Sequence, residues 1–487
     1  MNQVIDYHAI LPELILSGTI LLVLVVDVFL PARRKWMSMP VGLAGVLATL
    51  GAVLSLLGET RSTFGGMFVV DNFAILFKLF FLTVAVVVLL LSLRYFREGG
   101  FYQGEYYFLL LTSFLGCILM PSSRDLLMLF ISLELVSAPG FLMAAFRKND
   151  PRGNEGGLKF FLIGVLSTAV MLYGMSIVYG LTGTTRLAGI GRALATVGAG
   201  QESLVWASIL FIVAGFAFKV SAVPFQFWSP DTYEGSPVPV AAFLAVASSA
   251  SGFAGLLQLM FVAFPAQADF WTPIFAALSI ATMTIGNLVA LQQRQVVRLL
   301  AYSGIAQTGY ILLPFALVGA SAAVDGAAFS AAVTYILLYG VMNLGAFAVV
   351  IAVSRRSPGL LIGDFAGLAR RAPLLAVGMT AFMVSLAGIP PTGGFWAKIF
   401  IFTAAIDRGG IGPWLAAAMV VNSVVSVAYY FAVPKAMIFT EAEDRSPLGA
   451  SPLVTAVVGV ALLAITAAFF WPDLFARAPQ FSTLVGR

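Results

Sequence analysis

SLAGIPPTGGFWAKIF, residues 385–400, interrupts an apolar run that extends from about Leu374 to Ile406. As a single helix this run would be roughly 50 Å long, because each residue adds about 1.5 Å, and that is too long for one straight membrane span. Proline removes a backbone donor and glycine frees the chain, so we expect a broken helix at Pro390 and Pro391. Lys398 follows this break by seven residues.

A second apolar segment has the same character. FIVAGFAFKVSAVPFQFW, residues 211–228, contains Lys219 and then Pro224. Interrupted helices in corresponding positions of two halves indicate an inverted-repeat transporter whose site lies at the interruptions. We therefore expect the chemistry of this chain near Lys219 and Lys398.

The composition places the whole chain in a membrane. Of its 487 residues 60% are hydrophobic and 10% are charged, with a mean hydropathy of +0.98, whereas about 25% of a soluble domain is charged. The first apolar segment carries Glu13 and Asp27 with no basic region before it, so we expect it to be retained rather than cleaved. Because Cys117 is the single cysteine and His8 the single histidine, no disulfide, cysteine-rich metal site or cofactor is implied.

The spacing of the apolar segments predicts an all-α polytopic protein. With about 20 apolar residues per span, fourteen transmembrane helices are expected, centred near residues 20, 48, 83, 113, 136, 168, 213, 251, 281, 307, 340, 386, 425 and 462. Sixteen Lys and Arg residues fall in the odd-numbered loops, and seven fall in the even-numbered loops and the C-terminal tail. By the positive-inside rule the odd loops are cytoplasmic and both termini lie outside.

Ionisable side chains inside these spans are the candidate functional residues, because a charge at bilayer depth is costly unless it is paired or hydrated. Glu134 lies about ten residues from either end of its span, and Lys219 lies deep in another. A Glu134–Lys219 pair would be a switchable proton holder, because separating the carboxylate weakens the hold of the lysine on its proton. The alternatives are a structural hydrogen-bond partner at Glu134 and a snorkelling lysine at Lys219.

Three other lysines have stronger structural alternatives. Lys159 lies about four residues into its apolar segment, where snorkelling competes with a role in a relay. Lys398 is central only if its helix is truly interrupted. Lys78 follows Asp71 by seven residues and could share a helix face with it, which favours a structural pairing.

Hydroxyl and amide side chains lie between these charges. They could hold a chain of ordered waters or only join neighbouring helices, and the ones we assign to a supporting role are Ser249, Gln307, Tyr310 and Tyr339. With no histidine inside a span, a proton relay must use lysine, glutamate, hydroxyls and water. The chain has no phosphate-binding loop, no catalytic triad and no basic cluster suited to nucleic acid.

Five stretches together resemble one family, the antiporter-like membrane subunits of bacterial respiratory complex I, the NADH:quinone oxidoreductase, and most closely its subunit N. They are GLKFFLIGVLSTAVMLYG (157–174), FKVSAVPFQFWSPDTYEGSPVPVAAFLA (218–245), RLLAYSGIAQTGYILL (298–313), YGVMNLGAFAVV (339–350) and SLAGIPPTGGFWAKIF (385–400). The PDTYEGSPVPV and LKFFLIG motifs favour subunit N over the L and M subunits. The resemblance extends through nearly the whole chain.

The resemblance implies an architecture and a setting. It implies fourteen helices, inverted five-helix repeats at about spans 4 to 8 and 9 to 13, and broken helices at spans 7 and 12. Within a single transmembrane domain, 1–487, this gives three N-terminal helices (1–100), a first repeat (105–265), a second repeat (270–440) and a last helix with its tail (450–487). It also implies the bacterial inner membrane, surrounding lipids, redox chemistry in other subunits, and neighbours that include an M-type antiporter-like subunit and small K-type and J-type subunits.

The resemblance also assigns roles to residues. Glu134 matches the fifth-helix glutamate, Lys219 the seventh-helix lysine and Lys398 the twelfth-helix lysine. Two positions depart from the family pattern: Ser249 stands where an eighth-helix lysine is usual, and Gln307 stands where a histidine is common in the tenth helix.

We therefore expect a proton-translocating subunit that couples quinone reduction elsewhere in the complex to proton movement. The expected relay comprises Glu134, Lys219, Lys159 and Lys398 with water. Two alternatives remain open: a cation/proton antiporter subunit of the Mrp type, and a spacer that conducts nothing. The departures at Ser249 and Gln307 alter the central relay: either water and hydroxyls substitute there or protons take another route, and the spacer becomes more plausible.

Overall fold

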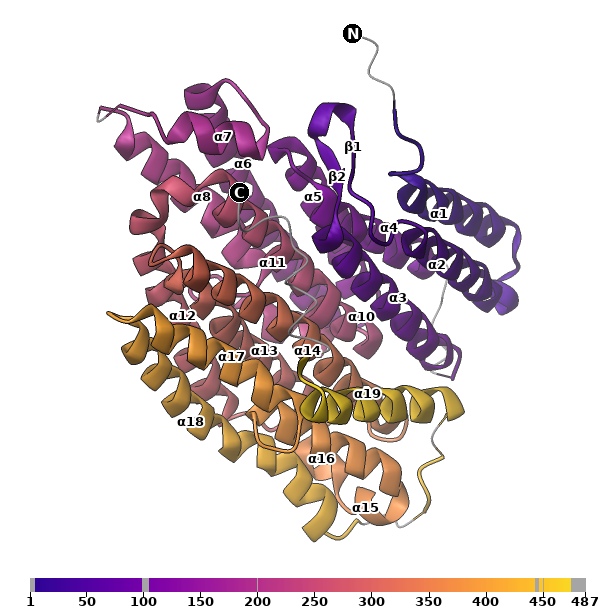
Figure 1. Ribbon diagram of the computed structural model, residues 1–487. Coiled ribbons are helices and arrows are strands. Elements are labelled where there is room, and N and C mark those ends of the chain that lie inside the picture. The colour runs from indigo at the N-terminus through magenta and orange to yellow at the C-terminus, as the bar shows by residue number, and fades with distance from the viewer. Residues whose placement is uncertain (1–4, 99–104, 199, 443–445, 450, 474–487) are drawn as a thin grey trace.

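The computed structural model describes residues 5–98, 105–198, 200–442, 446–449 and 451–473, which form a bundle of helices (Figure 1). A short antiparallel hairpin of β1 (Arg61–Thr63) and β2 (Phe68–Val70) precedes α3 and pairs Ser62 with Val69. The helices are α1 (Leu11–Phe29), α2 (Ser38–Leu54), α3 (Asn72–Glu98), α4 (Tyr106–Leu119), α5 (Leu126–Ala144), α6 (Pro151–Thr182), α7 (Leu187–Leu194), α8 (Glu202–Lys219), α9 (Trp228–Gly235), α10 (Val238–Phe243), α11 (Ser249–Gln258), α12 (Ala268–Ala290), α13 (Val296–Leu312), α14 (Ala322–Ser354), α15 (Leu368–Arg371), α16 (Pro373–Ala387), α17 (Gly393–Arg408), α18 (Gly412–Phe439) and α19 (Pro452–Phe470).

The predicted polytopic helical class is confirmed. In the described part of the chain, twelve helical segments are long and apolar enough to cross a membrane, and Tyr106–Ser122 and Pro373–Ala387 are shorter apolar helices. Each of the fourteen predicted centres falls inside a helix. The count of fourteen spans, the inverted repeats and the division at 105–265 and 270–440 stay predictions.

The ends of α6 show how local sequence sets the helix boundaries. The Asp150 side chain accepts a hydrogen bond from the backbone N–H of Arg152 at 3.1 Å, Pro151 is the first helical residue, and Gly183 closes the helix with φ of 66°. Proline costs nothing where no N–H partner exists, and glycine adopts the left-handed conformation freely. The 32 residues of α6 span about 48 Å, so the helix projects beyond a hydrocarbon core of about 30 Å.

The centre of the bundle is formed by α14 and by the helical segment Val238–Ala263. In each of these segments 94% of the 18 most apolar consecutive residues are buried, whereas in α19 the corresponding share is 28%. Against this centre α12 and α13 pack backbone to backbone, since a Cβ at Gly309 would lie 2.4 Å from the Met283 nitrogen. Small residues therefore bring the polar side chains of α13 into the interior.

Both predicted helix interruptions are present. The chain leaves α8 at Lys219 and begins α9 at Trp228, and it leaves α16 at Ala387 and begins α17 at Gly393. Gly388 has φ of +84°, and a Cβ at Gly394 would lie 1.9 Å from the Ser385 carbonyl oxygen. Glycine at both positions therefore allows α17 to start directly beside the open end of α16.

Candidate functional site

Lys219 lies inside the bundle at the first break. It is the last residue of α8, it is 2% exposed, and its Nζ donates to Ser137 Oγ of α5 at 2.8 Å. A Cβ at Gly252 of α11 would lie 2.9 Å from Lys219 Cγ, so this glycine makes room for the lysine stem. An ammonium has three donors, and one neutral hydroxyl satisfies only one of them.

Glu134 lies one helical turn before Ser137 on α5. It is half-buried, and its Oε1 is buried without a hydrogen-bond partner among the residues that the structure describes. No ion pair joins Glu134 to Lys219 in the described part of the chain, because the ammonium bonds Ser137 instead. Since residues three apart share a helix face, Glu134 and the partner of Lys219 belong to the same side of α5.

Lys398 lies inside the bundle at the second break. It is 6% exposed, its Nζ donates to the Ala387 carbonyl at 2.8 Å, and it sits 4.6 Å from the centre of the Tyr310 ring. The C-terminal end of α16 and the face of an aromatic ring both attract a cation. Lys398 also borders an open, largely apolar groove of about 240 Å³ between α17 and α18.

Gln307 of α13 belongs to the Lys398 site. Its Nε2 donates to the Leu386 carbonyl at 3.0 Å and to the Tyr430 hydroxyl at 2.9 Å, and its Oε1 accepts from the Tyr335 hydroxyl at 2.5 Å. The amide is therefore fully engaged and holds the end of α16 against α13. Sequence reasoning selected Gln307 as a departure from a family pattern and did not foresee these bonds.

The other predicted supporting residues differ in what they contact. The Tyr310 hydroxyl accepts from Asn287 Nδ2 at 3.1 Å, so both ends of this side chain are engaged. The Tyr339 hydroxyl accepts from Asn343 of its own helix at 2.7 Å, and Ser249 Oγ donates to the carbonyl five residues earlier at 3.1 Å. The structure thus brings Tyr310 to a lysine and gives Tyr339 and Ser249 bonds within their own helical segments.

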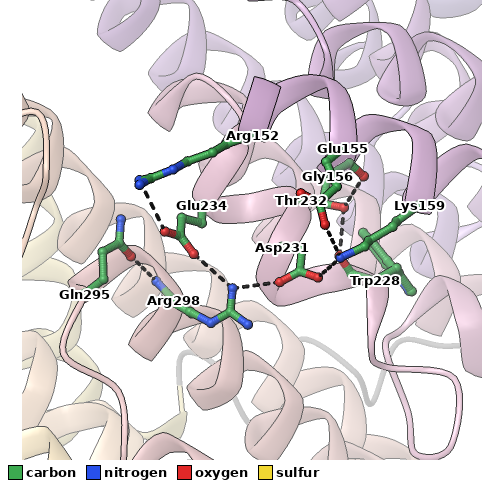
Figure 2. A network of polar contacts seen from close by, with 10 residues as sticks. All are labelled: Arg152, Glu155, Gly156, Lys159, Trp228, Asp231, Thr232, Glu234, Gln295 and Arg298. Atoms are coloured by element: carbon green, nitrogen blue, oxygen red, sulfur yellow. Dashed lines mark hydrogen bonds and ion pairs between the residues drawn. The ribbon is translucent and has the colours of Figure 1, made fainter. Parts of the chain in front are cut away.

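Lys159 joins a network of ion pairs at the start of α6 (Figure 2). Its Nζ lies 2.6 Å from Asp231 Oδ2 of α9 and 2.7 Å from Glu155 Oε1, and its side chain is 41% exposed. A Cβ at Gly156 would lie 2.7 Å from the Asp231 carbonyl, so this glycine lets α9 rest on α6. The structure places Lys159 at a surface end of its helix and not beside the buried lysines.

The same network reaches α13. Arg298 Nη1 lies 2.7 Å from Asp231 Oδ1 and 2.9 Å from Glu234 Oε2, as Figure 2 shows, and Arg152 adds a longer pair with Glu234 at 3.8 Å. Asp231 thus joins α6 to α13. Sequence reasoning did not select Asp231 or Glu234, although two carboxylates in PDTYEGSP directly after a predicted break were a usable signal.

Lys78 has a structural partner, but one from another helix. Its Nζ lies 2.7 Å from Glu13 Oε1 of α1, with side-chain exposures of 0% and 8%. Asp71 instead forms an ion pair with Arg124 at 2.8 Å. Pairing with Asp71 along one helix face was therefore the wrong geometry, because a lysine reaches sideways to a neighbouring helix more easily than two turns along its own.

Among the described residues, no three His, Cys, Asp or Glu side chains are grouped to hold a metal ion.

Comparison with known proteins identifies the family. Residues 123–426 match the family described as NADH:quinone oxidoreductase/Mrp antiporter, TM, and the chain belongs to this family of membrane proteins. It is 40% identical to NADH-quinone oxidoreductase subunit N of Trichlorobacter lovleyi over 473 residues, which cover 97% of this chain and 95% of that one. It is 43% identical to the subunit N of Moorella thermoacetica over 426 residues, 87% of this chain and 86% of that one. The resemblance to subunit N drawn from the motifs is confirmed.

Solved structures share the fold. A chain of respiratory complex I from Thermus thermophilus with bound aureothin superposes with a TM-score of 0.78 at 31% identity, covering 96% of this chain and 98% of that one. A chain of the Mrp complex from Dietzia sp. DQ12-45-1b has a TM-score of 0.83 at 20% identity, with coverage of 97% and 96%, and shows the fold alone. The chain is a multi-pass membrane protein of the antiporter-like type.

Proposed function

We propose that this chain is a proton-translocating subunit of an NADH–quinone oxidoreductase complex, in which other subunits carry out the redox chemistry. The observation that supports this most directly is the placement of Lys219 and Lys398. Both are almost fully buried, and each lies beside the open end of a broken helix. A buried amine whose neighbours can rearrange is a group that can take up and release a proton.

The first half of the proposed relay lies at Lys219. Ser137 holds the ammonium, and Glu134 lies one turn away with an unpartnered carboxylate oxygen. A shift of α5 by part of a turn would exchange the hydroxyl for the carboxylate as partner of the lysine. This exchange would alter how firmly Lys219 holds its proton, as the predicted pair requires.

The second half lies at Lys398. Its neighbours are the Ala387 carbonyl, the Tyr310 ring and an open groove of about 240 Å³ between α17 and α18. We assign Lys159 to the ionic network with Asp231 and not to the buried relay, since two carboxylates already hold it. Moving one charge against about 200 mV requires roughly 4.6 kcal/mol, which quinone reduction in partner subunits would supply.

The test measures protons moved per electron in the assembled complex in sealed vesicles. Lys219→Ala and Lys398→Ala should each abolish most of the translocation, whereas Lys435→Ala, an exposed lysine on α18, should leave it unchanged. Unchanged stoichiometry in both buried-site variants would overturn the proposal in favour of a spacer. Sodium-dependent proton flux without an electron donor would instead favour a cation/proton antiporter.

We further propose the bacterial inner membrane as the location, with both termini outside. The charge distribution supports this orientation, since sixteen Lys and Arg residues fall in odd loops and seven in even loops and the tail, and cytoplasmic loops carry the excess. An M-type antiporter-like subunit and small K-type and J-type subunits are the proposed neighbours. Protease accessibility of terminal tags in oriented vesicles tests the orientation, and tags cleaved only from the cytoplasmic side would refute it.

A further inference from the structure

The open end of α16 is closed in part by side chains. The last four carbonyls of a helix have no partners within it. Two of those in α16 accept from backbone N–H groups of the following turn, and the other two accept from side chains. The Leu386 carbonyl accepts from Gln307 at 3.0 Å, and the Ala387 carbonyl accepts from Lys398 at 2.8 Å. Gln307 and the functional lysine are therefore bound to adjacent carbonyls.

The open end of α8 is held by the next residue along α13. The carbonyl of Val220, the first residue beyond α8, accepts from Thr308 Oγ1 at 2.7 Å. Thr308 is 4% exposed and Gln307 is 1% exposed. Successive residues of a helix point about 100° apart around its axis, so α13 lies between the two breaks and contacts each with one of two consecutive side chains.

Two more contacts tie α13 to the same two places. The Tyr310 ring lies beneath the Lys398 ammonium, and Arg298 at the start of α13 pairs with Asp231, which lies in α9 just past the first break. A helix with its internal hydrogen bonds intact moves as one body. A displacement of α13 at one break therefore changes the contacts at the other.

We propose that Gln307 and Thr308 are positioning residues through which α13 makes the geometry around Lys219 depend on the geometry around Lys398. This rests on the proposed function, since it concerns how two parts of one proton relay are coordinated. An amide does not titrate as an imidazole does, so Gln307 contributes a fixed geometry where a histidine is common in the family. Thr308 supplies the matching contact on the other side.

The experiment uses proton translocation by the assembled complex in sealed vesicles. Thr308→Val removes one donor at nearly constant volume and should slow translocation about fivefold, the factor for one neutral hydrogen bond. Gln307→Met removes an amide that makes three hydrogen bonds, to Leu386, Tyr430 and Tyr335, and should slow translocation at least as much. Because either release disconnects the same helix, the double variant should be no slower than the slower single variant, whereas independent contacts would multiply the two factors. Thr308→Ser keeps the donor and should restore the original rate and its pH profile.

The control is Thr49→Val, which removes an equally buried hydroxyl that donates to the Gly45 carbonyl of its own helix α2 at 2.8 Å, away from both breaks. If Gln307→Met fails to assemble, Tyr335→Phe removes the hydroxyl that holds Oε1 of the same amide but leaves the bond to Leu386, so it should slow translocation in the same direction and by less. Additive losses, or single variants no slower than the Thr49→Val control, would overturn this inference. Lys219→Ala and Lys398→Ala are measured alongside: if they abolish translocation while the α13 variants do not slow it, only the coupling fails.

Discussion

The buried pair of Glu13 and Lys78 allows a stability prediction with a defined magnitude. The two charges are 2.7 Å apart, with side-chain exposures of 8% and 0%. Within the described ranges of the chain, neither the Lys78 ammonium nor either Glu13 oxygen has a hydrogen-bond partner of suitable geometry. The Lys78 ammonium also lies 4.8 Å from the centre of the Phe68 ring, but the ring carries no net charge, so removing either ion leaves the other without a charged partner.

The perturbation is a double-mutant cycle. Lys78→Met and Glu13→Gln should each lower the free energy of unfolding by about 3–5 kcal/mol, the cost of leaving one buried charge unpaired. The double variant replaces the pair with uncharged groups of similar volume, so it should cost far less than the sum. The coupling free energy should exceed about 2 kcal/mol.

The assay is denaturant unfolding in detergent micelles, followed by the loss of protection of α1 and α3 against hydrogen exchange. Arg370→Met is the control, because its pair with Glu441 is 3.9 Å long with exposures of 81% and 70%, and such surface pairs contribute about 0–1 kcal/mol. If Lys78→Met cost no more than Arg370→Met, or if the coupling were below about 0.5 kcal/mol, the reasoning from burial would be refuted.

Three further predictions concern other parts of the chain. Gly388→Ala should stop most proton translocation in vesicles without preventing assembly, because a Cβ there would lie 2.6 Å from Lys398 Cδ at φ of +84°. Asp231→Asn should increase hydrogen exchange at the start of α13 several-fold, because the carboxylate lies between two cations on different helices. Arg61 of β1, in the hairpin that precedes α3, donates a hydrogen bond to Asp6, and this bond lowers the pKa of Asp6 below its ordinary 3.8. The contact should therefore persist at neutral pH and be lost as the pH falls below about 4. Limited proteolysis at graded pH would show the loss.

Different outcomes would contradict each of these. Normal translocation in Gly388→Ala would mean that Lys398 does not need its observed position. Exchange in Asp231→Asn that matched a Glu155→Gln control would mean that the network does not anchor α13. Proteolysis of the loop before α3 that did not change between pH 7 and pH 3 would mean that the ion pair with Arg61 does not hold it, since the depressed pKa places its loss in that range.

The sequence predicted the fold well because backbone chemistry is local. Pro224 and Pro390 lack a backbone N–H and disfavour the helical conformation of the residue before them, so a break near each proline could be predicted from the residues themselves. The position of a residue along its apolar segment can also be read directly from the sequence. The burial of Lys219 and Lys398 could be predicted from that position.

The contacts of the candidate site were harder to predict, because they depend on which helices are neighbours. Lys219 bonds Ser137, one turn from the expected Glu134, and Lys78 bonds Glu13 of a different helix. A hydropathy pattern gives the height of a side chain but not its direction around the bundle. Asp231 was missed for a related reason, since a carboxylate near a helix end reads as a solvated charge until Lys159 and Arg298 are known to converge on it.

The closure of α16 by Lys398 affects how variants at this position are read. The ammonium is one of the groups that cap α16. A neutral side chain at this position therefore removes both a positive charge and a hydrogen bond to the last carbonyl of the helix. A functional defect in such a variant therefore has two origins that one substitution cannot separate. Chemical methylation of the amine keeps the positive charge and reduces the number of donors. It would therefore distinguish the effect of the charge from the effect of the capping hydrogen bond.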